Sequence, residues 1–395
     1  MRIAGALTLE NTLSTEPKVR ISAPVIALAM YAIASGYLMS LIPLMLTHYG
    51  LDTSLASWLA SSFYAGLLLG ALAIEPLVTR LGHRNGFVWC LGTLITTIAI
   101  MPAIPDASVW LLARFVAGVA VAGVFVVVES WLLHGNEADR AKRVGLYMGA
   151  FYGGSSLGQL CLGFVGVHGV MPFVAIFTAL LFAVGVLLLI KSDQPSSAEI
   201  TPLSFKQITK LNHAAIMGCI VSGLTLGAVY GLMPLELIQR GIAHQHLGGL
   251  MALVILGAMA VQPLIPMLSR YLSRTLLMAL FCLLGVAAIS LTLSFAGLYA
   301  LGAGLFLLGM ALFALYPVAI NLACDNLDAH YIVSATQIML FSYSLGSVAG
   351  PIIADGFILR EQGLMGYLFT CLLATSIYML IASIKLKSKA KGVYG

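Results

Sequence analysis

Twelve long apolar runs, separated by short polar, glycine or proline breaks, constrain what this chain can fold into. Most are about 20 residues or longer, the length that an α-helix needs to cross a hydrocarbon core of about 30 Å. Only 9% of the 395 residues are charged and 60% are hydrophobic, whereas about a quarter of the residues in soluble domains are charged. The sequence therefore predicts an all-α polytopic membrane protein. Its twelve spans are expected at about 21–47, 54–78, 86–104, 108–133, 143–167, 169–190, 211–238, 246–268, 275–294, 297–323, 332–358 and 363–384.

The polar segments divide the chain into five parts. We expect an N-terminal arm at 1–20, a six-helix half at 21–190, a linker at 191–210, a second six-helix half at 211–384 and a basic tail at 385–395. The arm has no apolar core typical of a cleaved signal peptide. The linker is the only long polar segment between the apolar runs.

The positive charges of the loops predict the orientation in the membrane. If the N-terminus is cytoplasmic, that side collects seventeen Lys and Arg residues, against Arg240 and Arg360 on the other side. We therefore expect a multi-pass membrane protein with both termini in the cytoplasm. The formal net charge of +5 is explained by these loops, so no nucleic-acid partner is expected. The expected partners are a small-molecule substrate, protons and the lipid bilayer, and the chain is expected to be a monomer.

The two halves repeat one pattern. An offset of 190 to 192 residues maps Pro43, Gly50, Pro76, Arg80, Arg84, Gly154, Ser155 and Gly158 onto Pro234, Gly241, Pro266, Arg270, Arg274, Gly346, Ser347 and Gly350. The largest offset also carries Glu129 onto Asn321. Because each half has an even number of spans, the repeats are parallel, which predicts a substrate site between them near the midplane.

Two ionisable residues, Arg114 and Glu129, lie within the apolar run 108–134. They are 15 residues apart, so on a helix they share broadly one face and are separated by about 22 Å. An ionisable group that faces hydrocarbon costs several kcal/mol, so we expect this face to line the bundle interior or a water-filled cavity.

The sequence resembles the major facilitator superfamily over nearly its whole length. The resemblance rests on the 2–3 loop RLGHR, the fourth-span motif ARFVAG, VVVESW at the end of that span, and the glycine-rich YMGAFYGGSSLGQL in span five. The family's loop pattern is matched at Arg80, Gly82 and Arg84 but differs at Glu75, Thr79 and His83. Its antiporter-associated pattern in span five is matched by Gly145, Gly154, Gly158 and Gly163, with Gln159 and Leu162 at variance.

This resemblance implies the major facilitator fold and a secondary active transporter that moves a small organic solute by alternating access with proton coupling. The span-five glycines slightly favour export by exchange, although such glycines also permit close helix packing. Uptake by symport and a non-transporting receptor or assembly partner on the same scaffold are the alternatives. A pump driven by nucleotide hydrolysis is not expected, because the chain has no phosphate-binding loop of the G-x-x-x-x-G-K-[ST] type. The resemblance to a transporter family also implies that the chain is not an enzyme. The six cysteines have no metal-binding or redox spacing, so neither a metal site nor a cofactor is expected.

Glu129 has three interpretations. It is a latch to Arg80, His83 or Arg84 that holds the cytoplasmic side shut, as the family resemblance implies, or a proton carrier, or a carboxylate solvated at the interface. Glu75 is the second candidate acid, because it lies one turn before the loop arginines.

Arg114 resembles the fourth-span arginine of the family. Binding an anionic substrate group, relaying a proton and extending to the outer interface are its three possible roles.

Polar and aromatic residues near the midplane predict a substrate pocket with little fixed charge, suited to neutral, amphipathic or singly charged small molecules. Many such tyrosines only pack in a core or at an interface. The candidates are Tyr31, Tyr37, Tyr64, Tyr152, Gln159, Tyr230, Gln262, Tyr316, Asn321 and Tyr343.

Overall fold

The computed structural model describes residues 22–133, 137–190, 212–295, 297–325, 329–359 and 362–392. Within these ranges, the side chains at 75, 77, 79, 132–133, 137–142, 329–334 and 385–392 are not described. The predicted N-terminal arm and the predicted linker lie outside the described residues.

The first half is a group of helices that ends before residue 191. Its elements are α1 (Ser22–Met45), the short 3₁₀ helix η1 (Thr47–Tyr49), α2 (Leu55–Ala73), α3 (Glu75–Leu81), α4 (His83–Ala103), α5 (Ala107–Leu133), α6 (Glu137–Phe164) and α7 (Met171–Leu189). The second half contains α9 (His213–Gln239), α10 (His244–Val261), α11 (Leu264–Leu268), α12 (Arg274–Ser294), α13 (Leu298–Cys324), α14 (Ala329–Ile358) and α15 (Gly363–Gly392). The described residues contain helices and no strands, so the predicted all-α fold is confirmed.

Eleven described helices are long and apolar enough to cross a membrane. The remaining predicted span, the fifth at 143–167, corresponds to α6, which is longer than predicted because it starts at Glu137. Charged residues in its first turns and glycines and serines in its middle lower its hydropathy. It nevertheless lies between α1 and α10 and packs against both.

Two predicted spans are interrupted at equivalent places. The second span ends at Ala73, and α3 begins at Glu75 with Pro76 in its first turn. The eighth span ends at Val261, and α11 follows Pro263. A proline is tolerated in the first turn of a helix but disrupts a helix interior, so each repeat breaks where its proline occurs.

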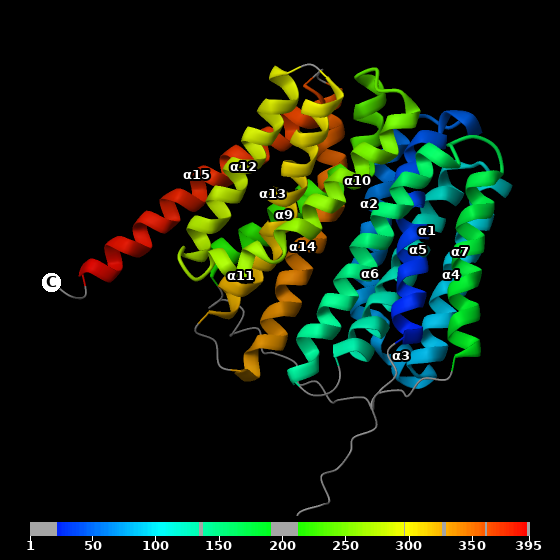
Figure 1. Ribbon diagram of the computed structural model, residues 1–395, viewed down its shortest axis with the longest axis horizontal. Coiled ribbons are helices and arrows are strands. Elements are labelled where there is room, and N and C mark those ends of the chain that lie inside the picture. The colour runs from blue at the N-terminus through cyan, green and yellow to red at the C-terminus, as the bar shows by residue number, and fades with distance from the viewer. Residues whose placement is uncertain are drawn as a thin grey trace, which may run out of the picture.

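The two halves lie side by side, as Figure 1 shows. Four helix pairs join them: α6 with α10, α2 with α14, α2 with α9, and α1 with α9. By contrast, α5 makes its main contacts within the first half and α13 within the second. Below, "outer end" means the end with the α1–α2 and α9–α10 loops, and "inner end" means the end with α3 and α11; the names follow the predicted orientation.

Close helix contacts repeat in the two halves. A Cβ atom at Gly154 on α6 would collide with the Ala29 carbonyl oxygen on α1, and one at Gly346 on α14 would collide with the Ile220 carbonyl oxygen on α9. Only glycine allows two helix backbones to approach this closely. The parallel six-helix repeats predicted from the sequence are therefore visible in the packing.

The contacts of α5 and α13 refine the alignment of the repeats. Gly118 packs against the Phe63 backbone, and Gly309 packs against the Val254 backbone. Both residues of the second pair lie 191 positions after those of the first.

This offset carries Arg114 onto Leu305 and Glu129 onto Ile320. The predicted equivalence of Glu129 with Asn321 is therefore wrong by one residue, because the offset of 192 belongs to α6 and α14 and not to α5 and α13. The second half has apolar residues at both positions.

Candidate functional site

Arg114 is buried inside the first half, with 7% of its surface exposed. Its guanidinium carbon lies 4.3 Å from the ring centroid of Phe63 on α2, close enough for a cation–π interaction. Its Nε has no hydrogen-bond partner among the described residues. Arg114 therefore does not extend to the outer interface but points into the protein.

Two small cavities adjoin Arg114. One, of about 30 Å³, is lined by Tyr31, Ser35 and Phe63 of the first half. The other, of about 20 Å³, is lined by Tyr64 of the first half and Tyr230 of the second. A site of this size holds about one water molecule or one polar ligand atom, so there is room beside Arg114 for a water molecule or an anionic oxygen, next to Tyr230 of the second half.

A chain of aromatic rings crosses from the first half to the second. Tyr31 on α1 contacts Phe125 on α5 at 6.4 Å between centroids, and Phe125 contacts Phe151 on α6 at 5.3 Å. The chain continues from Phe151 to Tyr152 at 5.6 Å and then to Phe313 on α13 at 5.9 Å. These distances are typical of favourable edge-to-face pairs.

The last ring of this chain is Tyr230 on α9, which contacts Phe313 at 5.9 Å. We call the six rings the aromatic layer. On α5, Phe125 lies between Arg114 and Glu129, so this ring of the layer lies between the arginine and the acid along the helix.

Glu129 lies one turn beyond Phe125, toward the inner end of α5. Its side chain is exposed, and Oε1 accepts a hydrogen bond from the Tyr147 hydroxyl of α6 at 3.2 Å. Glu129 therefore lies toward the inner end of α5 and contacts α6, whereas Arg114 lies 15 residues nearer the outer end of the same helix.

Next to the loop between α3 and α4, the described partners of Arg84 lie on α7. Arg84 donates hydrogen bonds to the carbonyl oxygens of Leu187, at 2.6 Å, and Leu188 at the C-terminal end of α7. A cation is favoured there because helix carbonyls and the helix dipole are negative.

The other loop residues are placed as follows. The buried ring of His83 packs against Trp131 at 6.2 Å. Arg80 is exposed. The side chain of Glu75 lies outside the described residues. The latch that the sequence predicted for Glu129 thus stays a prediction.

Four of the ten residues predicted for the substrate pocket lie in the aromatic layer or beside Arg114, and two more form a pair in the second half. Tyr31, Tyr152 and Tyr230 belong to the aromatic layer, and Tyr64 lines the smaller cavity together with Arg114 and Tyr230. Tyr316 and Tyr343 stack at 4.9 Å in the second half.

The other four predicted pocket residues lie elsewhere. Tyr37 donates a hydrogen bond to the Gly166 carbonyl at the outer end, and fully buried Gln159 accepts one from Ser40 at 2.6 Å. Gln262 and Asn321 donate their amide hydrogens to carbonyl oxygens of their own helices, at 3.2 and 2.8 Å.

Sequence reasoning missed Tyr147, Phe125, Phe151 and Phe313. Helical spacing held a usable signal, because Tyr147 and Phe151 on α6 are four residues apart, like Phe125 and Glu129 on α5. Side chains spaced by four residues on each of two helices can contact one another across a helix pair. The sequence alone does not show which two helices form that pair.

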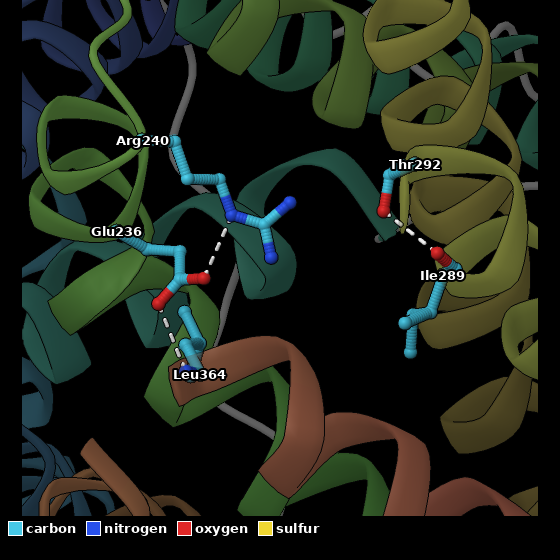
Figure 2. Close-up of polar contacts among 5 residues, drawn as sticks. All are labelled: Glu236, Arg240, Ile289, Thr292 and Leu364. Carbon is cyan, nitrogen blue, oxygen red and sulfur yellow. Dashed lines mark hydrogen bonds and ion pairs between the residues drawn. The ribbon is translucent and has the colours of Figure 1, made fainter. Parts of the chain in front are cut away.

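The second half keeps its charged groups near helix ends. Glu236 of α9 is buried and accepts hydrogen bonds from Arg240 Nε and from the Leu364 backbone N–H of α15, both at 2.9 Å (Figure 2). Gly363, with φ +68°, lies beside this carboxylate, and a Cβ atom there would be 3.2 Å from its oxygens. At the inner end, Arg274 pairs with Asp325 at 3.0 Å.

Metal chemistry has no support in the described part of the chain, where no group of three or more His, Cys, Asp or Glu side chains converges.

Comparison with known proteins supplies independent observations. The sequence pattern of the Major Facilitator Superfamily matches residues 25–351. An uncharacterized MFS-type transporter of Yersinia pestis is 36% identical over 336 residues, covering 82% of this chain and 85% of the relative. The uncharacterized MFS-type transporter YcaD of Escherichia fergusonii is 34% identical over 342 residues, with the same coverage.

Two solved structures are similar in fold. The nucleoside transporter NupG, as its D323A mutant, has a TM-score of 0.75 at 12% identity and covers 93% of this chain and 98% of its own. A bacterial homologue of the human lysosomal transporter Spinster, in an inward-facing, unoccupied conformation, has a TM-score of 0.68 at 14% identity, with 92% and 95% coverage. At this identity the likeness concerns the fold alone.

Proposed function

The chain belongs to the major facilitator superfamily of membrane transporters, and from this premise we propose that it moves a small organic solute across the bacterial inner membrane by alternating access, coupled to protons. The observation that carries the proposal is the position of Arg114, buried at the boundary between the halves with its Nε free of protein partners among the described residues. A buried charge is costly, so a protein that only has to pack would gain by replacing it.

The aromatic layer supports a path that opens on one side at a time. Its rings come from α1, α5 and α6 in the first half and from α9 and α13 in the second. Relative rotation of the halves separates Tyr152 from Phe313, which is the ring contact of this layer that joins α6 to α13. Alternating access in such folds is rocking of one half against the other.

Glu129 and Arg114 are the proposed coupling residues. Glu129 is exposed on the inner side of the layer, and Tyr147 supplies the hydrogen bond that orients its carboxylate. Arg114 lies on the outer side with cavities that suit a water or an anionic oxygen. We propose that Glu129 takes up and releases the coupling proton, and that Arg114 binds the solute or exchanges protons with water.

The direction of transport is a separate proposal. The span-five glycines favoured export by exchange, but Gly154 and Gly158 pack directly on the α1 backbone, which already accounts for them. We retain export in exchange for protons as the direction to be tested, with uptake by symport as its alternative.

The test is solute-driven proton flux. Purified protein would first be screened by thermal shift against metabolites, nucleosides, siderophores and drugs, because a ligand that binds only the folded state raises the melting temperature. Each hit would then be added to proteoliposomes that contain pyranine. Export by exchange and symport move protons in opposite directions relative to the solute. Absence of flux with every hit and gradient contradicts the proposal and favours a receptor.

Glu129→Gln is the decisive variant. We expect solute-driven proton flux to fall by about 30-fold, or about 2 kcal/mol, while insertion and melting temperature stay as in the wild type. The matched control is Asp52→Asn, an exposed acid of the α1–α2 loop; the Ser54 backbone N–H bonds to its carboxylate at 2.7 Å and holds its pKa below its usual value. Wild-type flux in Glu129→Gln leaves only the solvated-carboxylate interpretation.

A further inference from the structure

A second, larger recess lies on the perimeter, away from the aromatic layer. It measures about 1280 Å³ and is lined by α1 and α6 of the first half and by α10 and α13 of the second. Its lining includes Leu157, Leu256 and Leu298, which are 56%, 41% and 38% exposed. Because these helices span the bilayer, such exposed leucines face acyl chains. The recess is therefore a groove open to lipid.

The groove exists because its walls lack side chains. Gly149 and Gly153 on α6 and Gly249 on α10 line it, and a Cβ atom at each would meet open space. Gly154, one residue further along α6, instead packs against α1. The three open glycines thus serve no close helix contact and leave room for a molecule.

The groove also contains polar groups. Ser156 of α6 lines it, is 6% exposed, and its Oγ has no hydrogen-bond partner among the described residues. At the outer end, Gln245 and His246 lie in the first turn of α10, where residue Ala243 supplies no side-chain cap. A helix N-terminus favours anions through its free N–H groups and its dipole.

The charge of this end suits an anionic head group. The α9–α10 loop and the start of α10, residues 240–246, contain an arginine and two histidines but neither Asp nor Glu. The neighbouring start of α13 at Leu298 and Tyr299 carries no charge. Arg240 is already paired with the buried Glu236 one turn before it, so the groups left at this end to donate to a phosphate are the free N–H groups of α10 and its glutamine and histidine side chains.

We propose that this groove binds one phospholipid of the bilayer leaflet at the outer end. Its phosphate lies at the N-terminus of α10, near Gln245 and His246, and an acyl chain lies along the open glycines of α6 and α10. Ser156 bonds to the polar linkage or to the head group of the lipid. Because the groove is lined by both halves, the lipid stabilises the arrangement seen here. This inference concerns the bilayer side of the protein and does not depend on the transported solute.

The test is native mass spectrometry of the full chain purified in mild detergent with added phosphatidylglycerol. Gly153→Leu combined with Gly249→Leu fills the groove, and Gly92→Leu on α4 is the matched control, because a Cβ atom there also meets open space but does not line the groove. We expect at least a fivefold loss of the one-lipid species in the double variant and none in the control. Unchanged lipid binding in the double variant overturns the proposal.

Two further measurements keep the test decisive if the leucines disturb folding. Gly153→Ala with His246→Ala should lower phosphatidylglycerol binding at least threefold, whereas binding of neutral diacylglycerol should be weak in every form. Equal binding of the two lipids would overturn the phosphate contact. If the wild type shows a dimer that only the double variant loses, with lipid binding unchanged, the groove receives a second copy of the chain and the proposal is wrong.

Discussion

The first half holds Arg114 inside its bundle, whereas the second half has fully buried Leu305 at the equivalent position. The same contrast recurs toward the inner end, where Glu129 corresponds to Ile320. Conversely, the ion pairs that the structure describes both belong to the second half, at Glu236–Arg240 and Arg274–Asp325. The two halves therefore share one helix arrangement but differ in where their charged residues lie.

This difference in the placement of charged residues points to different roles for the two halves. A charge without a counter-charge inside a membrane protein lowers stability and is expected where it binds or couples. A charged side chain that forms an ion pair at a helix end is neutralised by its partner or solvated by water. Such a pair can hold two helices together. We infer that the first half carries the coupling chemistry and that the second half provides a firm surface against which the first half moves.

The strongest test of this contrast exchanges the residues at the two equivalent positions, Arg114 and Leu305. Leu305→Arg places an unpaired cation at a position with 0% exposure and should destabilise the protein by about 3–5 kcal/mol. The yield of monodisperse protein and its melting temperature would show this. Tyr271→Arg, at an 82% exposed position between α11 and α12, is the control and should be tolerated. A normal melting temperature for Leu305→Arg would mean that the second half can also hold an interior charge.

The reverse exchange, Arg114→Leu, should leave stability unchanged or raise it, because it removes a buried charge that has no acidic partner among the described residues. Solute-driven flux should fall by about 100-fold, or about 2.7 kcal/mol. Arg114→Lys keeps the charge but loses the planar fork and should be intermediate. If flux survives in Arg114→Leu while the protein melts earlier, the arginine is structural and the contrast between the halves fails.

In the second half, Glu236→Gln should reduce stability without much effect on transport. The amide cannot accept strong hydrogen bonds from both Arg240 and the Leu364 N–H, so α15 loses part of its attachment to α9. We expect a loss of about 1–2 kcal/mol, measured by thermal unfolding, with flux per folded molecule within about twofold of the wild type. A large loss of flux at normal stability would place a coupling residue in the second half.

The smallest effect is expected for Arg274→Ala. Its partner Asp325 is 40% exposed and Arg274 itself is 30% exposed, and exposed pairs contribute about 0–1 kcal/mol. Melting temperature and flux should both stay close to wild type. A severalfold change in flux would show that this inner pair acts as a latch, and the second half would then take part in gating.

Much of the fold followed from the sequence because membrane spans and repeats leave strong patterns. The apolar runs located the helices, and the offset between repeated prolines and glycines located the halves. The register within the repeats did not follow so well. Glu129 and Asn321 were paired by an offset that applies to α6 and α14, because the loop between α5 and α6 differs in length from that between α13 and α14.

The candidate site was predictable only in part. Arg114 and Glu129 could be found because a charge in an apolar run is conspicuous, and the structure buries Arg114 and bonds Glu129 to Tyr147 of α6. The contacts that the neighbouring charged residues make could not be predicted. Arg84 binds the end of α7 instead of an acid, and nothing in its spacing indicates which helix end lies nearby.

The close contact between Gln159 and Gly248 has a mechanical consequence. A Cβ atom at Gly248 would collide with the Gln159 carbonyl oxygen, so α6 and α10 touch backbone to backbone near their outer ends. In the rocking motion proposed above, this point would act as the pivot. The start of α6 at Glu137 is 22 residues away, about 33 Å along the helix axis, so a rotation of about 10° about the pivot would move the inner end of α6 through about 6 Å. A small tilt that keeps this backbone contact would thus be enough to separate the inner ends of the two halves by the width of a small molecule.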